Sequence, residues 1–456
     1  MADKNTINNI SDAERRQLRH KRRIRNQVIA YVVLVVLVVG AATGGLYGVK
    51  TVGQKLYENK VAKEAEAESI AAAEAESEAA ELAAIVAANE AESEEPTPEV
   101  VEETTEDLLE EVVQSCIADM SLEDKVAGLF IVTPEGLTGV DKAVRAGDGT
   151  KEALEKYAVG GVVYFAQNIQ SDNQIKEMVA NTVSYSKYPL FIAVDEEAGK
   201  VARLQTALKL DATDTPQAIG EGAEASAAYN AYSIIGERLA TYGFNLDFAP
   251  VADVLNSDAN GAIGDRSFGS DAAVVSDMVT QAVQGLTSNG ITACIKHFPG
   301  QGSVDEDTHD GMAATERSAD DMKNTDILPF IAGIEAGAEM VMVGHFTCPS
   351  LAEDATTPCS LSKAVMTDLL RGEYGYNGVI ITDALNMTAI SEYYGADEAA
   401  IKALKAGADM ILMPEDFETA YNGVLEAVKD GSIDEQRIND SLARVYRIKY
   451  RSTVEN

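Results

Sequence analysis

The chain contains eight short apolar segments, and helix-forming stretches separate them. The segments span residues 128–134, 159–166, 189–197, 244–254, 291–300, 339–346, 378–385 and 409–414. Continuous apolar runs are typical of parallel strands that are buried on both faces, and each gap leaves room for a crossover helix. Eight strands that alternate with helices make a (β/α)8 barrel. The sequence therefore predicts an α/β fold in which residues 106–456 form a single TIM-type barrel.

Several stretches between these segments have the sequence signals of helices. Residues 121–129 read SLEDKVAGL, and Ser121 and Asp124 have the spacing of a helix-capping box. Residues 362–375 and 398–408 are also predicted to be helical, with glycines where each helix should stop.

The N-terminal part of the chain has a different character. Residues 1–25 carry a strongly basic cluster, and residues 26–49 contain no charged residue. This apolar run is long enough to cross a bilayer, and basic residues stay on the cytoplasmic side. We expect a single-pass cell-membrane protein with a cytoplasmic N-terminus and an extracellular catalytic domain. A cleaved signal peptide and a buried core helix are the alternatives.

The segment that follows is rich in alanine and glutamate. Residues 50–105 are acidic and contain few aromatic residues, so they can bury little apolar surface. We expect a helical or disordered stalk that holds the barrel away from the membrane. The net charge of the whole chain is −37, which argues against nucleic acid as a partner because phosphate binding needs a basic face.

The four cysteines are too few for a disulfide framework in a chain of 456 residues. Cys348 and Cys359 are close enough in sequence to close one surface loop. Cys294 lies in an apolar segment and is expected to be a packed thiol. None of the four has metal-ligand spacing, and we expect neither a metal nor a cofactor.

Polar residues gather where the predicted strands end. In a barrel enzyme these carboxyl ends surround the active site. The residues at these positions are Asp195, Glu196, Asp253, Lys296, His297, His345 and Asp383. For Asp253 and His345 the alternative is that they orient the groups that touch the substrate.

Asp383 follows an apolar strand segment and should project into the mouth of the barrel. A buried carboxylate without partners costs several kcal/mol. Asp383 should therefore have either a cationic neighbour or a chemical role. The structural alternative is that Asp383 caps the next helix.

The loop after Lys296 contains a second candidate group. Only four histidines occur in the chain, and two of them, His297 and His309, lie within residues 296–311. Asp307 lies two positions before His309 and can accept a hydrogen bond from the imidazole, which would raise its basicity. An inert surface histidine is the alternative.

These candidates suit retaining glycoside hydrolysis, in which one carboxylate attacks and an acid/base group protonates the leaving oxygen. Here a His–Asp dyad takes the place of the usual second carboxyl group. Lys296, Arg203 and Arg266 can donate to hydroxyl groups, and Asp195 can accept from them. Internal ion pairs are the alternative for these four residues.

From about Met120 to Tyr450 the chain resembles glycoside hydrolase family 3, and within it a membrane-anchored bacterial form of the β-N-acetylhexosaminidase branch. The matching motifs are MSLEDKVAGLF, VDEEAGKVARL, NLDFAPVADV, IGDRSFGSD, KHFPGQG followed by DTH, and GVIITDALNM. The resemblance implies Asp383 as nucleophile and His309 with Asp307 as the acid/base dyad. It also implies that the sugar is bound by Asp195, Arg203, Arg266, Lys296 and His297.

Two positions depart from the pattern of the branch. Lys200 stands where arginine is usual, and Gln301 stands where histidine is usual. Neither change affects the nucleophile or the dyad. The chain ends soon after a predicted final helix, so no second domain is expected to supply the acid, which agrees with a dyad inside the barrel.

The expected function is exo-hydrolysis of terminal β-linked N-acetylglucosamine from cell-wall, including peptidoglycan, or other extracellular glycans. A β-glucosidase or a glycoside phosphorylase of the same family is an alternative. A catalytically silent, membrane-tethered glycan-binding protein is the alternative from another class. The glycan is the expected partner besides the membrane, and the sequence leaves the oligomeric state open.

Overall fold

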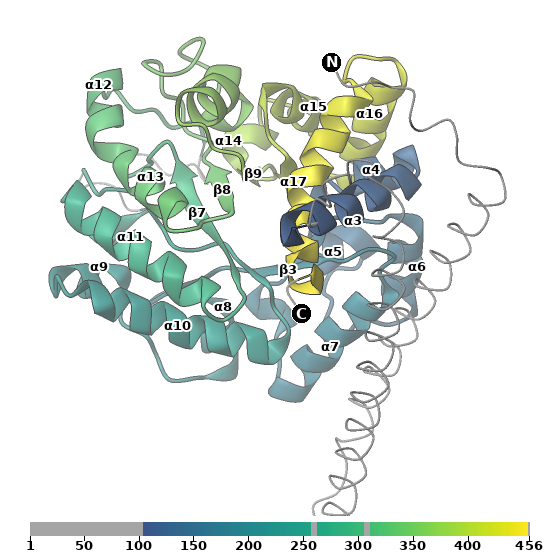
Figure 1. Cartoon of the computed structure of the whole chain (residues 1–456), viewed down its shortest axis with the longest axis horizontal. Helices are drawn as coiled ribbons and strands as arrows, with labels where there is room; N and C mark the ends of the chain where they lie inside the picture. The colour runs from purple at the N-terminus through teal and green to yellow at the C-terminus, as the bar shows by residue number, and fades with distance from the viewer. Residues whose placement is uncertain (1–103, 257–261, 305–310, 455–456) are drawn as a thin grey trace, which may run out of the picture. The chain divides into compact units, whose positions relative to one another are not determined.

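Eight parallel strands form a closed barrel at the centre of the fold (Figure 1). The strands are β1 (Phe130–Val132), β2 (Gly161–Val163), β3 (Phe191–Val194), β6 (Leu246–Asp247), β7 (Thr292–Phe298), β8 (Met340–Val343), β9 (Val379–Ala384) and β10 (Met410–Leu412). Each strand pairs with the next one along the chain, and β10 closes the barrel on β1 with Phe130 opposite Ile411. Every strand lies inside one of the eight predicted segments, so the predicted barrel is confirmed.

The computed structural model describes residues 104–256, 262–304 and 311–454, which belong to one unit, residues 101–456. The basic segment 1–25, the proposed membrane span 26–49 and nearly all of the stalk 50–105 lie outside the described residues and stay predictions. Within the described residues, no helix has both the length and the apolar character needed to cross a membrane.

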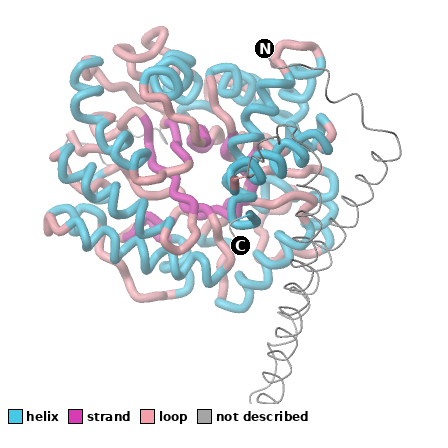
Figure 2. Tube along the Cα trace, in the orientation of Figure 1, coloured by secondary structure: helices cyan, strands magenta, loops and turns pink. Residues whose placement is uncertain are grey.

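Helices surround the barrel on its outer side (Figure 2). The α-helices are α3 (Thr105–Asp119), α4 (Leu122–Ala127), α5 (Pro134–Thr138), α6 (Asp148–Lys156), α7 (Asp172–Tyr185), α8 (Arg203–Leu208), α9 (Pro216–Glu221), α10 (Ala225–Tyr242), α11 (Ala272–Thr287), α12 (Ala319–Asp321), α13 (Leu328–Glu335), α14 (Thr388–Ser391), α15 (Ala396–Ala406), α16 (Phe417–Lys429) and α17 (Glu435–Val454). Short 3-10 segments are η2 (Ala166–Asn168), η3 (Gly264–Arg266) and η5 (Cys359–Leu361), and π-helical segments are η4 (Met322–Asp326) and η6 (Ala364–Glu373).

The predicted helix signals act as expected. Ser121 caps α4 by accepting a hydrogen bond from the backbone N–H of Asp124. Helix α15 ends at Gly407, whose φ of 124° is in the region that favours glycine. Within the predicted stretch 362–375, Ala364–Glu373 form a π-helical segment, η6.

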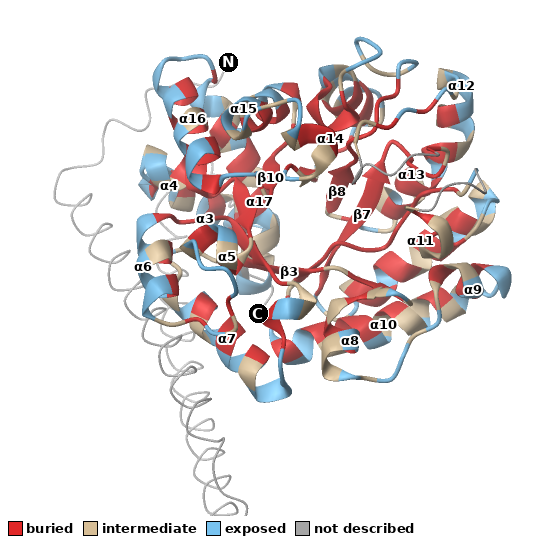
Figure 3. Cartoon of the chain, turned by 180° about the vertical axis from the view of Figure 1, so that it is seen from behind, coloured by how far each residue is buried: buried red, intermediate tan, exposed pale blue. Residues whose placement is uncertain are grey.

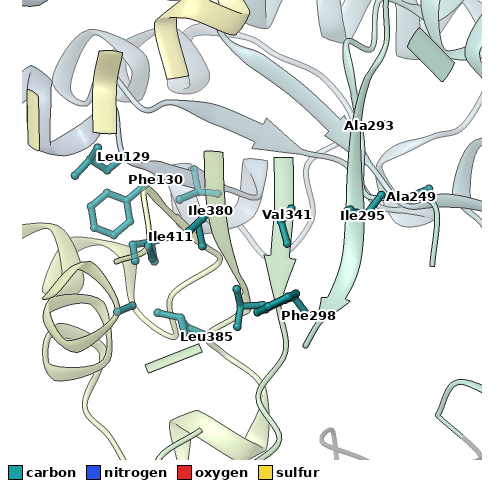
Figure 4. Packing of buried hydrophobic residues seen from close by; sticks show 14 of the residues in the cluster. Leu129, Phe130, Ala249, Ala293, Ile295, Phe298, Val341, Ile380, Leu385 and Ile411 are labelled. Atoms are coloured by element: carbon teal, nitrogen blue, oxygen red, sulfur yellow. The ribbon is translucent and has the colours of Figure 1, made fainter. Parts of the chain in front are cut away.

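Each strand buries side chains on two sides, which explains the continuous apolar sequences. Alternate residues of a strand point to opposite faces. On β9, Ile380 belongs to the outer cluster under the helices, whereas Val379 and Ile381 belong to a separate cluster inside the barrel. Figure 4 shows part of the outer cluster, and Figure 3 shows buried residues concentrated on the strands and on the inward faces of the helices. The core is therefore two concentric layers.

Helix α17 covers the amino-terminal end of the barrel. Its Val445 belongs to the cluster inside the barrel, and Ile448 packs against that cluster. Lys449 donates to the carbonyl of Gly160 immediately before β2, and Arg451 pairs with Glu339 immediately before β8. Helix α17 thus fills the amino-terminal end of the barrel interior, although Ile448, Lys449 and Arg451 also line a cavity of about 450 Å³ on that side. The carboxyl ends of the strands are where the charged residues proposed from sequence gather.

The structure differs from the expected strands in two places. The third segment was expected to continue to Glu197, but β3 ends at Val194 and an antiparallel hairpin follows, formed by β4 (Glu196–Ala198) and β5 (Val201–Ala202). The fourth segment forms only a two-residue strand, β6, and beyond it the pairing with β7 continues irregularly, since the N–H groups of Cys294 and Lys296 donate to the carbonyls of Ala249 and Pro250.

The cysteines also differ from one expectation. Cys348 and Cys359 are free thiols that are completely buried. The prediction that a disulfide between them could close a surface loop is therefore wrong. Cys294 is completely buried inside the barrel, as predicted for a packed thiol.

Candidate active site

A cavity of about 310 Å³ opens at the carboxyl ends of the barrel strands. Six of the eight residues proposed from sequence line it: Asp195, Arg203, Arg266, Lys296, His297 and Asp383. They come from the ends of β3, β7 and β9, from the start of α8 and from η3. The other two, Asp307 and His309, lie outside the described residues.

Lys296 is the central cation of this cavity. Its side chain is 3% exposed, and its Nζ atom lies 2.7 Å from Asp195 Oδ1 and 2.6 Å from Glu197 Oε1. Burial alone would lower the pKa of the ammonium group, but the two carboxylates outweigh it and raise the pKa. Lys296 is therefore charged at neutral pH and can hold Asp195 in a fixed orientation beside a ligand.

Glu197 was missed as a site residue. It is almost completely buried and forms a two-pronged ion pair with Arg266, at 2.7 Å from both Nε and Nη2. Burial would raise the pKa of this carboxyl, but Arg266 and Lys296 together hold it well below its usual range. A signal was available, because Asp195 and Glu197 are two residues apart and an extended chain places such residues on the same side.

The β4–β5 hairpin positions Glu197. The hairpin turns at Ala198 and Gly199, both with positive φ, and a Cβ on Gly199 would lie 2.9 Å from the Cα of Thr215. The buried Tyr232 hydroxyl donates to the carbonyl of Glu197 at 2.7 Å. Beyond the turn, Lys200 pairs with Asp265 at 2.7 Å, next to Arg266. The hairpin is thus tied to the segment that carries its arginine partner.

Asp253 fixes the orientation of His297. The carboxylate is completely buried and lies 2.8 Å from His297 Nδ1, and it also accepts the backbone N–H of Gln301 at 2.7 Å. Because a carboxylate accepts, Nδ1 carries the hydrogen and Nε2 is the ring atom left for a ligand. Asp253 therefore orients His297, a residue that lines the cavity, which is the role proposed for it from sequence.

Asp383 lies near the end of β9 and accepts the backbone N–H of Ala384 on Oδ1 at 2.7 Å. Burial would raise the pKa of Asp383, but His345, His297, the N–H of Ala384 and Lys296 outweigh it and lower the pKa. Asp383 is thus an ionised carboxylate beside a cavity. It does not cap the following helix α14, because the N-cap residue of that helix is Met387 and no side chain makes a capping hydrogen bond there.

The walls of the cavity are largely apolar. They include Val163, Phe165, Phe248, Met342, Met387, Leu412 and Met413. Arg203 lies over Phe165, with the guanidinium carbon 5.7 Å from the ring centroid. Apolar walls with a few convergent charged groups are the usual composition of a small-molecule site.

Two buried acidic residues, Asp247 and Glu196, do not line the cavity, and sequence reasoning gave neither of them a chemical role. Asp247 Oδ1 accepts the N–H of Glu196 at 2.9 Å, and Oδ2 has no hydrogen-bond partner among the described residues. Burial raises the pKa of Asp247 well above its usual value. Glu196 accepts the first N–H groups of α8, and burial raises its pKa to about 7.

His345 is completely buried, and the residues that line the cavity do not include it. Its two ring nitrogens contact Ser360 and the carbonyl of Ala384.

Over the ranges that the structure describes, no three His, Cys, Asp or Glu side chains come together in a way that could hold a metal ion.

This chain is similar to proteins that are named as β-hexosaminidases. It is 32% identical over 327 residues to Beta-hexosaminidase A of Pseudoalteromonas piscicida, covering 65% of this chain and 54% of that protein. It is 36% identical over 286 residues to Beta-hexosaminidase of Stenotrophomonas maltophilia (strain K279a), covering 60% and 82% of the two chains.

A solved structure is similar over most of the barrel. It is a glycoside hydrolase family 3 beta-N-acetylglucosaminidase from Paenibacillus sp. str. FPU-7, with a TM-score of 0.68 and 34% identity, covering 74% of this chain and 64% of that one. The chain thus spans about half of the Pseudoalteromonas protein and about two thirds of the Paenibacillus chain.

The sequence profile of the glycosyl hydrolase family 3 N-terminal domain matches residues 121–448, which include every described residue that lines the cavity. This match confirms the family that the motifs predicted. The chain belongs to glycoside hydrolase family 3.

Proposed function

We propose that the protein is a retaining β-N-acetylglucosaminidase that removes one terminal sugar at a time. The observation that carries the proposal is the cavity in which an ionised Asp383 lies beside Lys296, His297 and two arginines. A volume of about 310 Å³ is at the lower end of ligand-binding pockets, which suits one sugar unit better than a long chain. The β-hexosaminidase relatives support the choice of sugar.

Each charged group has a part in the proposed reaction. A carboxylate oxygen of Asp383 attacks the anomeric carbon while the bond to the leaving oxygen breaks, which gives a covalent glycosyl-enzyme. Asp195 accepts hydrogen bonds from sugar hydroxyls, and Arg203, Arg266, Lys296 and His297 donate to the sugar. Because Glu197 and Asp253 already hold three of these side chains in place, the donors need little reorganisation during the reaction.

The proton transfers are assigned to His309 and Asp307. His309 would give a proton to the leaving oxygen and later take one from the attacking water, with Asp307 stabilising the imidazolium. This assignment rests on the sequence motif, since both residues lie outside the described part of the chain.

The location of the enzyme is also a proposal. Residues 26–49 would anchor it in the cell membrane with the barrel outside, where cell-wall glycans are available. Treating intact cells with protease should remove the barrel from an anchored, outward-facing protein. Full protection from protease until the cells are lysed would contradict this location.

The activity is tested with the full-length protein in mild detergent on nitrophenyl β-N-acetylglucosaminide and nitrophenyl β-glucoside. We expect clear preference for the first, with the β-anomer of the sugar as the first product. Preference for the glucoside would indicate a β-glucosidase. Turnover that requires phosphate would indicate a phosphorylase, and binding without turnover would indicate a glycan-binding protein.

Asp383→Asn tests the assignment of the nucleophile. The variant keeps the size of the side chain but loses the attacking charge, so kcat should fall by at least about 10³-fold. Activity near that of the wild type would place the nucleophile elsewhere.

A further inference from the structure

The main-chain pairing between β8 and β9 stops immediately before the proposed nucleophile. The last pair in the register is Val343 with Thr382. After this pair the main chain of β8 turns away, and the N–H of Gly344 donates to the carbonyl of Phe298 on β7. Ala384 therefore has no pairing partner on β8 in this register.

The imidazole of His345 occupies the place of that missing partner. Its Nε2 atom lies 2.9 Å from the carbonyl oxygen of Ala384. A carbonyl can only accept, so Nε2 carries a hydrogen whether the ring is neutral or charged. The side chain of His345 thus extends the hydrogen bonding between the two strands by one residue.

Ser360 holds the other side of the ring. Its Oγ lies 2.7 Å from His345 Nδ1, and both residues are completely buried. Ser360 is itself fixed by its backbone N–H, which donates to the carbonyl of Gly344 at 3.1 Å. Because the carbonyl of Ala384 requires the hydrogen on Nε2, Nδ1 of a neutral ring accepts from the Ser360 hydroxyl, which holds the ring in this orientation.

Ala384 links this arrangement to the proposed nucleophile. Its N–H donates to Asp383 Oδ1 at 2.7 Å, and its carbonyl accepts from His345. On the opposite side, the N–H of Leu385 donates to the carbonyl of Leu412 on β10 at 2.9 Å. Asp383 is therefore followed by a residue that is held from both sides.

We propose that His345, oriented by Ser360, is a positioning residue for Asp383. By anchoring the carbonyl of Ala384, it restricts the rotation of the residue whose N–H holds Asp383 Oδ1, and so it aims the other carboxylate oxygen at the anomeric carbon. A misplacement of about 1 Å at a reacting group can cost 10²-fold in rate. The inference rests on the proposed function of Asp383.

Four variants of the full-length protein test this role. His345→Leu removes the donor, His345→Gln replaces it with an amide N–H, and Ser360→Ala removes the group that orients the ring. Ser441→Ala is the matched control, because Ser441 is also completely buried and donates one hydrogen bond of 2.7 Å, to Asp409 at the opposite end of the barrel. Thermal melting shows which variants are folded at the assay temperature.

The measurements are kcat, KM and the rate of covalent labelling by an N-acetylglucosaminyl fluoride with a second fluorine at C5, which slows breakdown of the glycosyl-enzyme. We expect His345→Leu to lower kcat and the labelling rate about 10²-fold, with KM changed less than about threefold. His345→Gln should recover to within about tenfold of the wild type, and Ser360→Ala should be intermediate. Ser441→Ala should match the wild type.

Two results would overturn the positioning role. One is labelling of folded His345→Leu at the wild-type rate. The other is a loss in folded His345→Gln as large as that in His345→Leu, which would mean that the donor to Ala384 is irrelevant. Failure of the proposed function is recognised separately, because the wild type would then not be labelled at Asp383 at all.

Discussion

The two ends of the barrel each contain a lysine whose pKa is shifted, but the directions of the two shifts are opposite. Lys296, at the carboxyl ends of the strands, has two carboxylates within 2.7 Å, and its pKa is raised. Lys449, at the amino ends, donates to the carbonyl of Gly160 at 2.6 Å and lies over the rings of Phe191 and Tyr446. Burial lowers the pKa of Lys449 to about 7.

The contrast shows how one residue type serves two purposes. Lys296 belongs to a network of carboxylates and cations that surrounds a cavity, and such a network keeps its charges ready for a polar ligand. Lys449 forms no ion pair among the described residues, and its stem and ammonium group help α17 to close the barrel. The charge of Lys296, at the carboxyl ends of the strands, has a proposed chemical role. The charge of Lys449, at the amino ends, costs stability.

The largest effect is expected for Lys296→Met. This change leaves the buried Glu197 with one cation fewer and releases Asp195, so we expect a loss of about 3–5 kcal/mol in the free energy of unfolding. Turnover should fall at least about 10²-fold, because the groups proposed to bind the sugar lose their fixed positions. Chemical denaturation and steady-state kinetics measure the two effects.

The matched control is Lys125→Met. Lys125 is also buried and also pairs with a carboxylate, Glu435, but it lies outside the cavity and its partner is half exposed. This variant should lose less than about 1 kcal/mol and keep its turnover. Equal losses of turnover in the two variants would remove the distinction between the cavity network and an ordinary ion pair.

A smaller effect of opposite sign is expected for Lys449→Met. The unfolded chain keeps the proton on Lys449 up to about pH 10.4, whereas the folded protein releases it above about pH 7. The unfolded state therefore binds more protons between these values, and the free energy of unfolding rises with pH through this window. From pH 7 to pH 9 this group contributes a rise of about 2 kcal/mol, at 1.36 kcal/mol per unit.

Lys449→Met should remove that rise and make the protein more stable at pH 7. Denaturation curves at pH 6, 7, 8 and 9 measure it, and Lys405→Met, at an exposed position on α15, is the control. If the free energy of unfolding of Lys449→Met still rose by the full amount from pH 7 to pH 9, the Lys449 amine would not be the source of the rise.

The smallest effect is expected for Lys200→Arg, which introduces the arginine that the sequence resemblance led us to expect at this position. Lys200 is 76% exposed and its pair with Asp265 is solvated, so stability should change by less than about 0.5 kcal/mol. Asp265 is the neighbour of Arg266 in the chain, so the change can reach the cavity only indirectly. We therefore expect kcat/KM to change by no more than about twofold. A tenfold change in kcat/KM would show that this surface pair belongs to the sugar-binding network.

Most of the barrel could be predicted from sequence because its strands are buried on both faces. Short, mostly apolar segments such as 339–346, separated by helix-forming stretches, are typical of strands in a parallel barrel, and all eight strands fall within such segments. The β4–β5 hairpin could not be predicted, because its strands are only three and two residues long and it depends on contacts with Thr215 and Tyr232 that are distant in sequence.

The site was predictable where a charged residue ends an apolar strand. Lys296, His297 and Asp383 were found in this way, and Arg203 and Arg266 came mainly from the family motifs. Glu197 and Asp247 were missed because their significance lies in burial and in partners far along the chain. The ion pairs and the binding site had been treated as alternatives for Lys296 and Arg266, but the structure shows ion pairs that line the cavity.

The most direct test of the central assignment is to trap the glycosyl-enzyme and locate the bond. The full-length protein is incubated with the 5-fluoro N-acetylglucosaminyl fluoride, digested and analysed by tandem mass spectrometry. We predict one added sugar per chain, on Asp383 in the segment GVIITDALNM. A sugar attached to any other residue, or an active enzyme that is never labelled, would contradict the account.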